Sequence, residues 1–554
     1  MAWKFTKQDW FFLAGLLLFA VLMHFGRIGS SIHGTVLATD PAMYCSIAAA
    51  LGSPEAFAND FSFGIASNFA THVTPLVRLV AWIAEEFLNG NCGLAYLSLT
   101  GFVVFLHYAA FYLLGRVVFE APWKALLFSI LTGMCYWTPW GTYWGAGYQD
   151  YTPRVIFNGF YALFLCALLF LLKKRACWPL LLFLLAGTVY IHPVSALPAA
   201  AGIWLSLAFS KDENCPMGRH IMWLCVAGAC FLVGILPYAA TYLHSSSMTL
   251  SPDEVAYMQE ILRTRFDREY ADFGQGMLQF YKQYTLLPVL PLALGATWLL
   301  ARCGNEKERL LCRHIWLWTA GVYIVAAIFL ADQFISSALG RVHLEFDLVR
   351  VHRFLPFFWM FLIFLGCNLL WRLCRQRTDW KKYACGVFCA GVCLGFFLGG
   401  LHTMARVSLP WYWLALDEGR YEKVYAKELA RYEMLTALQK VTKPDETIFT
   451  PLEDQAVRYL ARRSLTWCWK DACYLYYAKN LPALHRWEAV LKDLAKSPTA
   501  YIAAGIKTGA DYIVSDRPED RALLTEMAGP VVWENSGYVI VRNEHKQQPD
   551  GLTD

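Results

Sequence analysis

Residues 155–175 read VIFNGFYALFLCALLFLLKKR, which is eighteen residues without a charge followed by three basic ones. A helix needs about 20 mostly apolar residues to cross the hydrocarbon core of a bilayer, with about 17 as a practical minimum. Lys and Arg accumulate in the loops that stay in the cytoplasm. The stretch therefore predicts a membrane-spanning helix whose end at Lys173 lies on the cytoplasmic side.

The same pattern recurs along the chain. Hydrophobic residues make up 57% of the 554 residues and charged residues 16%, against about 25% charged in a soluble domain. Six short basic clusters mark the expected cytoplasmic loops: Lys4/Lys7, Arg116/Lys124, Lys173 to Arg175, Lys211/Arg219, Arg302 to Arg313 and Arg372 to Lys382. About eleven transmembrane helices are expected between them, over residues 9–28, 93–115, 124–140, 155–172, 178–192, 194–210, 219–242, 284–302, 313–331, 353–373 and 381–403.

Two parts are expected from this pattern. Residues 1–404 form a polytopic α-helical membrane module with its N-terminus in the cytoplasm, and its first helix reads as an uncleaved span rather than a cleaved signal peptide. A long first loop, residues 27–91, lies outside, and the charged apolar segment 73–88 within it reads as an interfacial helix. Residues 405–554 have the composition of a soluble domain.

The C-terminal part is predicted to be a periplasmic α/β domain. An amphipathic helix over 418–441 joins it to the membrane module. Strands are expected at 446–450 and 511–514, a helix at 454–463, and a hairpin over 531–542 that turns at Asn535-Ser536-Gly537. Cys468 and Cys473 lie together in this domain, either as a disulfide or as free thiols.

Composition and motifs exclude several functions. A formal charge of +5 is too small to indicate nucleic-acid binding, since topology and anionic lipid account for the excess. No Gly-rich nucleotide fingerprint or hydrolase nucleophile elbow occurs in the C-terminal domain. The seventeen cysteines form no Cys-x-x-Cys pair with zinc-ligand spacing.

The first loop begins with Thr39-Asp40-Pro41-Ala42-Met43-Tyr44. A carboxylate just outside the bilayer can remove the proton of an acceptor hydroxyl or bind a metal. Asp-Pro is also a good start signal for a helix, so Asp40 can equally be a helix cap. Tyr44 is a substrate-binding candidate beside it, and Asp60 reads as a substrate ligand or a turn residue.

The loop before the expected span 353–373 contains Glu345, Arg350 and Arg353. Two arginines three apart lie on one helix face, where they suit a lipid phosphate. The alternative is that they contact ordinary lipid headgroups.

Other outer loops hold further substrate-binding candidates. Asp150 and Arg154 lie four apart, either as an ion pair or facing a substrate. Tyr and Trp side chains from Tyr136 to Tyr151 form an interface belt or a surface for sugar stacking. His72 and His192 are polar candidates for a cavity.

In the C-terminal domain, the cluster Trp467-Cys468-Trp469-Lys470-Asp471 reads as the edge of a core strand or as a contact for an acceptor.

Together these features resemble the GT-C superfamily of integral-membrane glycosyltransferases, in which the first outer loop carries an essential acidic residue and arginines lie near the outer end of a late helix. Asp40 and Arg350/Arg353 occupy the matching positions. The resemblance implies transfer of a sugar from a polyprenyl-phosphate donor to a lipid or glycan acceptor by inverting displacement. In this reaction Asp40 acts as base and the arginines stabilise the departing phosphate. The first loop has no Asp-x-Asp pair, which leaves a requirement for Mg²⁺ or Mn²⁺ open.

Two other functions compete with a transferase. One is a multi-pass lipid or glycan transporter or flippase, although matching halves with broken helices are not evident. The other is a non-catalytic envelope assembly protein whose exported domain binds a partner. The expected location is the bacterial inner membrane with the working face in the periplasm; an endoplasmic reticulum membrane would put the same face in the lumen.

Overall fold

The structure is a computed structural model that describes residues 5–29, 37, 39–134, 152–210, 215–245, 250–265, 278, 281–282, 288–339, 354–375, 380–407, 423, 426–450 and 455–547. Contacts divide the chain into two compact units. The first contains residues 1–23, 101–240 and 267–407, and the second contains residues 24–100, 241–266 and 408–554. The expected boundary at Met404 stays a prediction, but the contacts group the first loop with the C-terminal segment.

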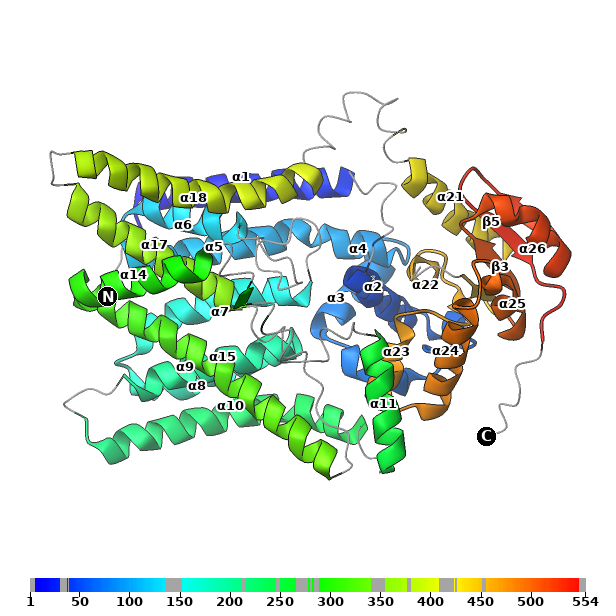
Figure 1. Cartoon of the computed structure of the whole chain (residues 1–554), viewed down its shortest axis with the longest axis horizontal. Coiled ribbons are helices and arrows are strands. Elements are labelled where there is room, and N and C mark those ends of the chain that lie inside the picture. Colours follow the sequence, from blue (N-terminus) through cyan, green and yellow to red (C-terminus); the bar gives the residue numbers. More distant parts are fainter. Residues whose placement is uncertain are drawn as a thin grey trace. The chain divides into compact units, whose positions relative to one another are not determined.

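The first unit consists of helices (Figure 1). Their bounds are α1 Lys7–Gly29, α5 Thr100–Phe119, α6 Pro122–Met134, α7 Pro153–Leu171, α8 Trp178–Ala186, α9 Pro193–Ala208, α10 Met217–Ser245, α14 Val289–Cys303, α15 Glu306–Ala338, α17 Leu355–Cys374 and α18 Trp380–Val407, with short 3₁₀ turns at Arg175–Cys177 and Gly187–Tyr190. Helices α1, α5 and α10 each cross by a few residues into the second unit.

Seven of the described helices are long and apolar enough to cross a membrane. The other four expected spans coincide with shorter described helices: α6, α9, α14 and the segment Arg175–Tyr190. Every expected span therefore overlaps a helix, and the polytopic helical class is confirmed. The total of eleven crossings stays a prediction.

Small residues let two pairs of these helices approach closely. Helices α9 and α15 cross at Gly202 and Gly321, where a Cβ added to Gly321 would lie 2.3 Å from the backbone nitrogen of Gly202. Helices α14 and α17 meet at Ala296 and Gly366. Small side chains at such crossings allow dense backbone packing, which is the main source of helix association in lipid.

The second unit combines helices with a five-stranded sheet. Its first-loop elements are α2 Thr39–Gly52, α3 Pro75–Phe87 and α4 Cys92–Ser98, with 3₁₀ turns at Pro54–Phe57, Ala66–Asn68 and Ala70–His72; α11 is Pro252–Arg265. The C-terminal elements are α21 Ala426–Val441, β1 Thr447–Phe449, α22 Ala456–Tyr459, β2 Ser464–Leu465, α23 Asp471–Ala478, α24 Leu481–Leu494, α25 Ala500–Lys507, β3 Tyr512–Ser515, a 3₁₀ turn Pro518–Asp520, α26 Arg521–Met527, β4 Val531–Glu534 and β5 Val539–Arg542.

The sheet has the order β2-β1-β3-β5-β4. Strand β1 pairs in parallel with β2 and β3, whereas β5 runs antiparallel to β3 and β4. This confirms an α/β domain and the hairpin around Asn535. The amide Nδ2 of Asn535 donates to the carbonyl of Ala430 on α21 at 2.9 Å, which fastens the hairpin to that helix.

Helix α22 is shorter than the predicted helix over 454–463. Arg462 has φ of 51°, a left-handed conformation that a helix does not continue through. The chain turns there into strand β2, so the tertiary contact of Arg462 takes precedence over the local helical pattern.

Helix α3 corresponds to the segment 73–88. It buries Val77, Val80, Ala81 and Ala84 on one face and exposes Leu79, Trp82 and Phe87 on another. It is not among the helices long and apolar enough to cross a membrane. Its place at a membrane interface stays a prediction.

Candidate functional site

Asp40 lies in the first turn of α2. A negative charge at this end of a helix is favoured by the helix dipole. One carboxylate oxygen, Oδ1, lies 3.2 Å from Nζ of Lys470 in the C-terminal segment. The Asp40 side chain remains 32% exposed, while that of Lys470 is 11% exposed. The carboxylate is therefore held by Lys470 and remains about one-third exposed to solvent.

Lys470 is positioned by an aromatic cluster. It directly precedes α23 and follows Trp467 and Cys468, both of which are buried. The indole of Trp467 stacks on that of Trp487 in α24. The indole nitrogen of Trp467 donates to the carbonyl of Trp487 at 3.1 Å, and the indole nitrogen of Trp487 donates to the carbonyl of Cys468 at 3.0 Å. The cluster Trp467 to Asp471 thus lies beside the edge strand β2 and supports the core, while Lys470 extends from it to the first loop.

A buried ion network lies at the start of the same helix. Arg458 in α22 donates to both oxygens of Asp60, at 2.8 and 2.9 Å, and to both oxygens of Asp471, at 2.7 and 2.9 Å. All three side chains are fully buried. Asp60 also accepts from the backbone amides of Ser62, Phe63 and Leu465. Its oxygens are occupied, so we assign Asp60 to the turn and the ion network rather than to a substrate.

The charges in this network are unequal, because two carboxylates share one guanidinium. Burial raises the pKa of Asp471 to about 6; Arg458 opposes this shift and Asp60 adds to it. Burial also disfavours the charged form of Arg458, but the two carboxylates outweigh it and hold the pKa of Arg458 well above its ordinary value. The network is a paired but net negative site inside the unit.

Other contacts join the first loop to the C-terminal segment. The hydroxyl of Tyr459 accepts from the backbone amide of Leu37 at 2.6 Å. Ser46 donates to the carbonyl of Gln455 at 3.2 Å. Arg462 donates to Glu85 of α3 at 2.6 Å. The position of Asp40 therefore depends on residues more than 400 positions away in the sequence.

His72 packs edge-on against Tyr474 and Tyr477, with ring centroids 5.2 and 5.3 Å apart. Its Nδ1 lies 3.1 Å from the hydroxyl oxygen of Thr71. Loss of contact with water lowers the pKa of His72 to about 4, so the ring is neutral at pH 7. This neutral ring belongs to the aromatic packing between the first loop and α23.

The second unit also contains a cavity of about 1,100 Å³. Residues from the first loop, from α11 and from the turn between α23 and α24 line it: Ile65, Ser67, Asn68, Leu250, Glu254, Ala478, Lys479, Asn480, Leu481, Pro482 and His485. Burial lowers the pKa of Lys479, and the ring of His485 stacks on Tyr257 with centroids 4.0 Å apart. A wall that mixes apolar side chains with a few polar groups is typical of ligand sites.

The remaining predicted residues fall elsewhere. Tyr44 lies in α2, half-buried, in the same unit as Asp40. Arg154 and His192 belong to the first unit: Arg154 donates to the hydroxyl of Thr152 at 3.0 Å, and the Nδ1 of His192 lies 2.8 Å from the hydroxyl of Ser195 at the start of α9. Asp150, Glu345, Arg350 and Arg353 lie outside the described residues. The predicted phosphate clamp therefore stays a prediction.

Metal binding was left open by the sequence. Within the part of the chain that the structure describes, no group of three His, Cys, Asp or Glu side chains is arranged to hold an ion. Cys468 and Cys473 are both buried, and no disulfide joins them in the described part of the chain.

Sequence reasoning singled out the segment that contains Lys470 but missed its pairing with Asp40, and it missed the central cation Arg458. A signal for Arg458 does exist, since it is an arginine within the otherwise apolar run from Ala456 to Ala461. A cation there requires buried carboxylates. No local pattern points from Lys470 to Asp40.

No protein-family model matches the chain, and no curated protein sequence matches it. Among solved structures, it is similar to the crystal structure of ArnT from Cupriavidus metallidurans bound to undecaprenyl phosphate. The identity is 11% and the TM-score 0.46, over 98% of this chain and 100% of that chain.

Proposed function

We propose that this protein is a membrane glycosyltransferase that moves a sugar from a polyprenyl-phosphate donor to a lipid or glycan acceptor. The observation that carries the proposal is the state of Asp40: a carboxylate in the first outer loop, held by Lys470 and still about one-third exposed. A purely structural carboxylate in the same unit, Asp60, is instead completely buried and occupied by hydrogen bonds.

In the proposed reaction, Asp40 removes the proton of an acceptor hydroxyl. The acceptor oxygen forms a bond to the anomeric carbon of the sugar while the bond from that carbon to the donor phosphate breaks. The phosphate leaves with the electron pair. Arg350 and Arg353, the arginines suggested by the resemblance to GT-C enzymes, are proposed to stabilise its charge. A positioned base accounts for about 10²–10⁴-fold of the rate.

We propose the cavity beside α23 and α24 as the surface that takes the acceptor. It belongs to the same unit as Asp40. Ser67, Asn480 and His485 offer hydrogen bonds to hydroxyl groups, and Ile65 and Leu481 offer apolar contact. Lipid-linked glycans combine both kinds of surface.

The test is transfer of radiolabelled sugar from polyprenyl-phosphate sugars to a membrane extract, with wild type and Asp40→Asn at equal expression. Glu86→Gln is the matched control, because it also removes one negative charge from an exposed position of the first loop. We expect a loss of about 10²-fold or more in Asp40→Asn and wild-type transfer in Glu86→Gln. Transfer unchanged in Asp40→Asn would reduce Asp40 to a structural residue of α2. Absence of transfer by wild type with every donor would favour a lipid transporter.

A further inference from the structure

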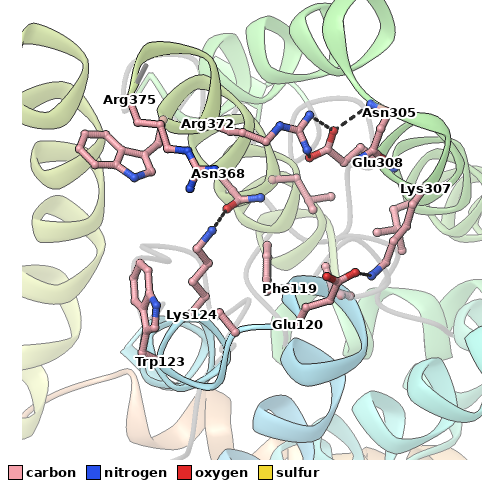
Figure 2. Close-up of a pocket in the computed structure, with 15 residues that line it drawn as sticks. Phe119, Glu120, Trp123, Lys124, Asn305, Lys307, Glu308, Asn368, Arg372 and Arg375 are labelled. Carbon is pink, nitrogen blue, oxygen red and sulfur yellow. Dashed lines mark hydrogen bonds and ion pairs between the residues drawn. The ribbon is translucent and has the colours of Figure 1, made fainter. Parts of the chain in front are cut away.

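Three of the basic clusters in the sequence meet at one cavity of the first unit. The cavity has a volume of about 390 Å³. Its walls come from the turn between α5 and α6, the start of α15 and the end of α17 (Figure 2). These segments belong to the clusters Arg116/Lys124, Arg302 to Arg313 and Arg372 to Lys382, which the charge pattern assigns to the cytoplasmic side.

The charged side chains of this cavity do not balance. Four basic groups, Lys124, Lys307, Arg372 and Arg375, face two carboxylates, Glu120 and Glu308, among the described lining residues. The excess is therefore two positive charges.

Among the described residues, ion pairs involve two of the basic groups of the cavity (Figure 2). Arg372 donates to both oxygens of Glu308, at 3.0 and 2.8 Å, and Lys307 lies 3.0 Å from Glu120. The ammonium of Lys124 instead donates to the neutral amide oxygen of Asn368 at 2.6 Å. Asn368 is uncharged, so this hydrogen bond does not neutralise the positive charge of Lys124.

The N-terminal ends of two helices add to the positive charge of the cavity. Helices α6 and α15 both begin at the cavity, and the partial positive charge of a helix N-terminus favours an anion. Lys124 and Lys307 lie in these first turns, where the dipole disfavours a cation. At the start of α15 the carboxylate of Glu308 already accepts from the backbone amide of Asn305 at 2.9 Å, whereas the first turn of α6 contains no acidic residue.

Aromatic side chains at the rim suit a lipid. Trp123 is 55% exposed and Trp371 37% exposed, and both line the cavity. In membrane proteins, indole rings are enriched at the level of the lipid headgroups. Basic pockets between transmembrane helices on the cytoplasmic side are a recurrent form of anionic-lipid site.

We propose that this cavity binds a phosphate group, carried by an anionic phospholipid of the cytoplasmic leaflet. The competing explanation is that the basic residues only set the topology of the chain. That explanation accounts for their presence in three loops, but it does not require them to converge on one cavity together with two helix N-termini. The proposal is independent of the transferase activity.

The experiment uses the full chain purified in a neutral detergent, with phosphatidylglycerol, phosphatidylcholine or inorganic phosphate as the added probe. Retained lipid is measured by native mass spectrometry, and the thermal midpoint is measured in parallel. The test variant is Lys124→Gln with Arg375→Gln. Its matched control is Arg302→Gln with Lys381→Gln, which removes two exposed cytoplasmic charges outside the cavity lining.

We expect phosphatidylglycerol, but not phosphatidylcholine, to bind and raise the midpoint in wild type and in the control variant. The cavity variant should bind it roughly tenfold to thirtyfold more weakly, as the loss of two surface charges implies. Equal stabilisation by inorganic phosphate alone would keep the phosphate site and assign it to a soluble phosphate compound.

Equal loss of binding in the cavity and control variants, or no loss in either, would overturn the proposal in favour of a topological role. If the double variant does not fold, Arg375→Gln alone decides, because that residue is exposed at the end of α17. If Arg375→Gln then binds phosphatidylglycerol as tightly as wild type does, the proposal is overturned.

Discussion

Arg458 donates hydrogen bonds to both carboxylate oxygens of Asp60, at 2.8 and 2.9 Å, across 398 positions of the sequence. The two side chains are fully buried. A buried charge is tolerated only when it is paired, and Arg458 is the cation that pairs with the buried carboxylate of Asp60. The contacts accordingly group the first-loop segment and the C-terminal segment in one compact unit.

Replacing Arg458 by Met should destabilise this unit strongly. The substitution leaves Asp60 and Asp471 buried without their cation, and breaking a buried ion pair in this way costs about 3–5 kcal/mol. The thermal midpoint of the purified protein measures the loss. Arg521→Met is the control, since the Arg521–Glu534 pair is 59% and 46% exposed and a surface pair contributes about 0–1 kcal/mol. Equal effects of the two variants would contradict a central role for the network.

Lys470→Met should lower transfer without unfolding the protein, if Asp40 is the base we propose. The substitution removes the 3.2 Å contact that holds Asp40, and misplacement of a catalytic group costs up to about 10²-fold in rate. We expect kcat to fall more than KM rises, and Lys470→Arg to recover part of the rate. A thermal midpoint lowered in proportion to the activity would indicate that Lys470 matters for folding alone.

His72→Phe should reduce the sensitivity of the protein to acid. The folded-state pKa of His72 is lowered to about 4, whereas an exposed histidine titrates near pH 6.5. Between these values the unfolded chain binds the proton and the folded chain does not. His72 therefore destabilises the fold progressively as the pH falls from about 6.5 to about 4.

The measurement is the thermal midpoint of wild type and His72→Phe across that pH range. The difference between them should change most between pH 6.5 and pH 4 and stay level above pH 7. The raised pKa of Asp471, about 6, acts in the opposite direction, but it is present in both proteins. Parallel curves would contradict a neutral, half-buried ring at position 72.

Gly321→Ala should separate α9 from α15. The new Cβ would lie 2.3 Å from the backbone of Gly202, so the helices must move, and overpacking of this kind costs about 1–3 kcal/mol. Gly295→Ala is the control, because a Cβ there meets nothing within 4 Å and alanine favours a helix. Thermal midpoints in detergent should fall for the first variant and stay level or rise for the second.

Much of the fold follows from local patterns. Apolar length and basic flanks located helices such as α7, with its charge-free span before Lys173. The turn Asn535-Ser536-Gly537 located the hairpin β4–β5. The local pattern predicted a longer helix than α22, which ends at Tyr459 before the left-handed residue Arg462 and strand β2.

The sequence by itself determined the membrane-spanning class, the acidic residue after the first helix and the soluble C-terminal part, because hydrophobic length, charge and turn chemistry act over a few residues. Only the tertiary structure decided that Lys470 holds Asp40, that Arg458 joins Asp60 to Asp471, and that Lys124, Lys307 and Arg375 share one cavity. These groups are far apart along the chain. Their pairing depends on which buried charges can be compensated once the helices have packed, and no local pattern contains that information.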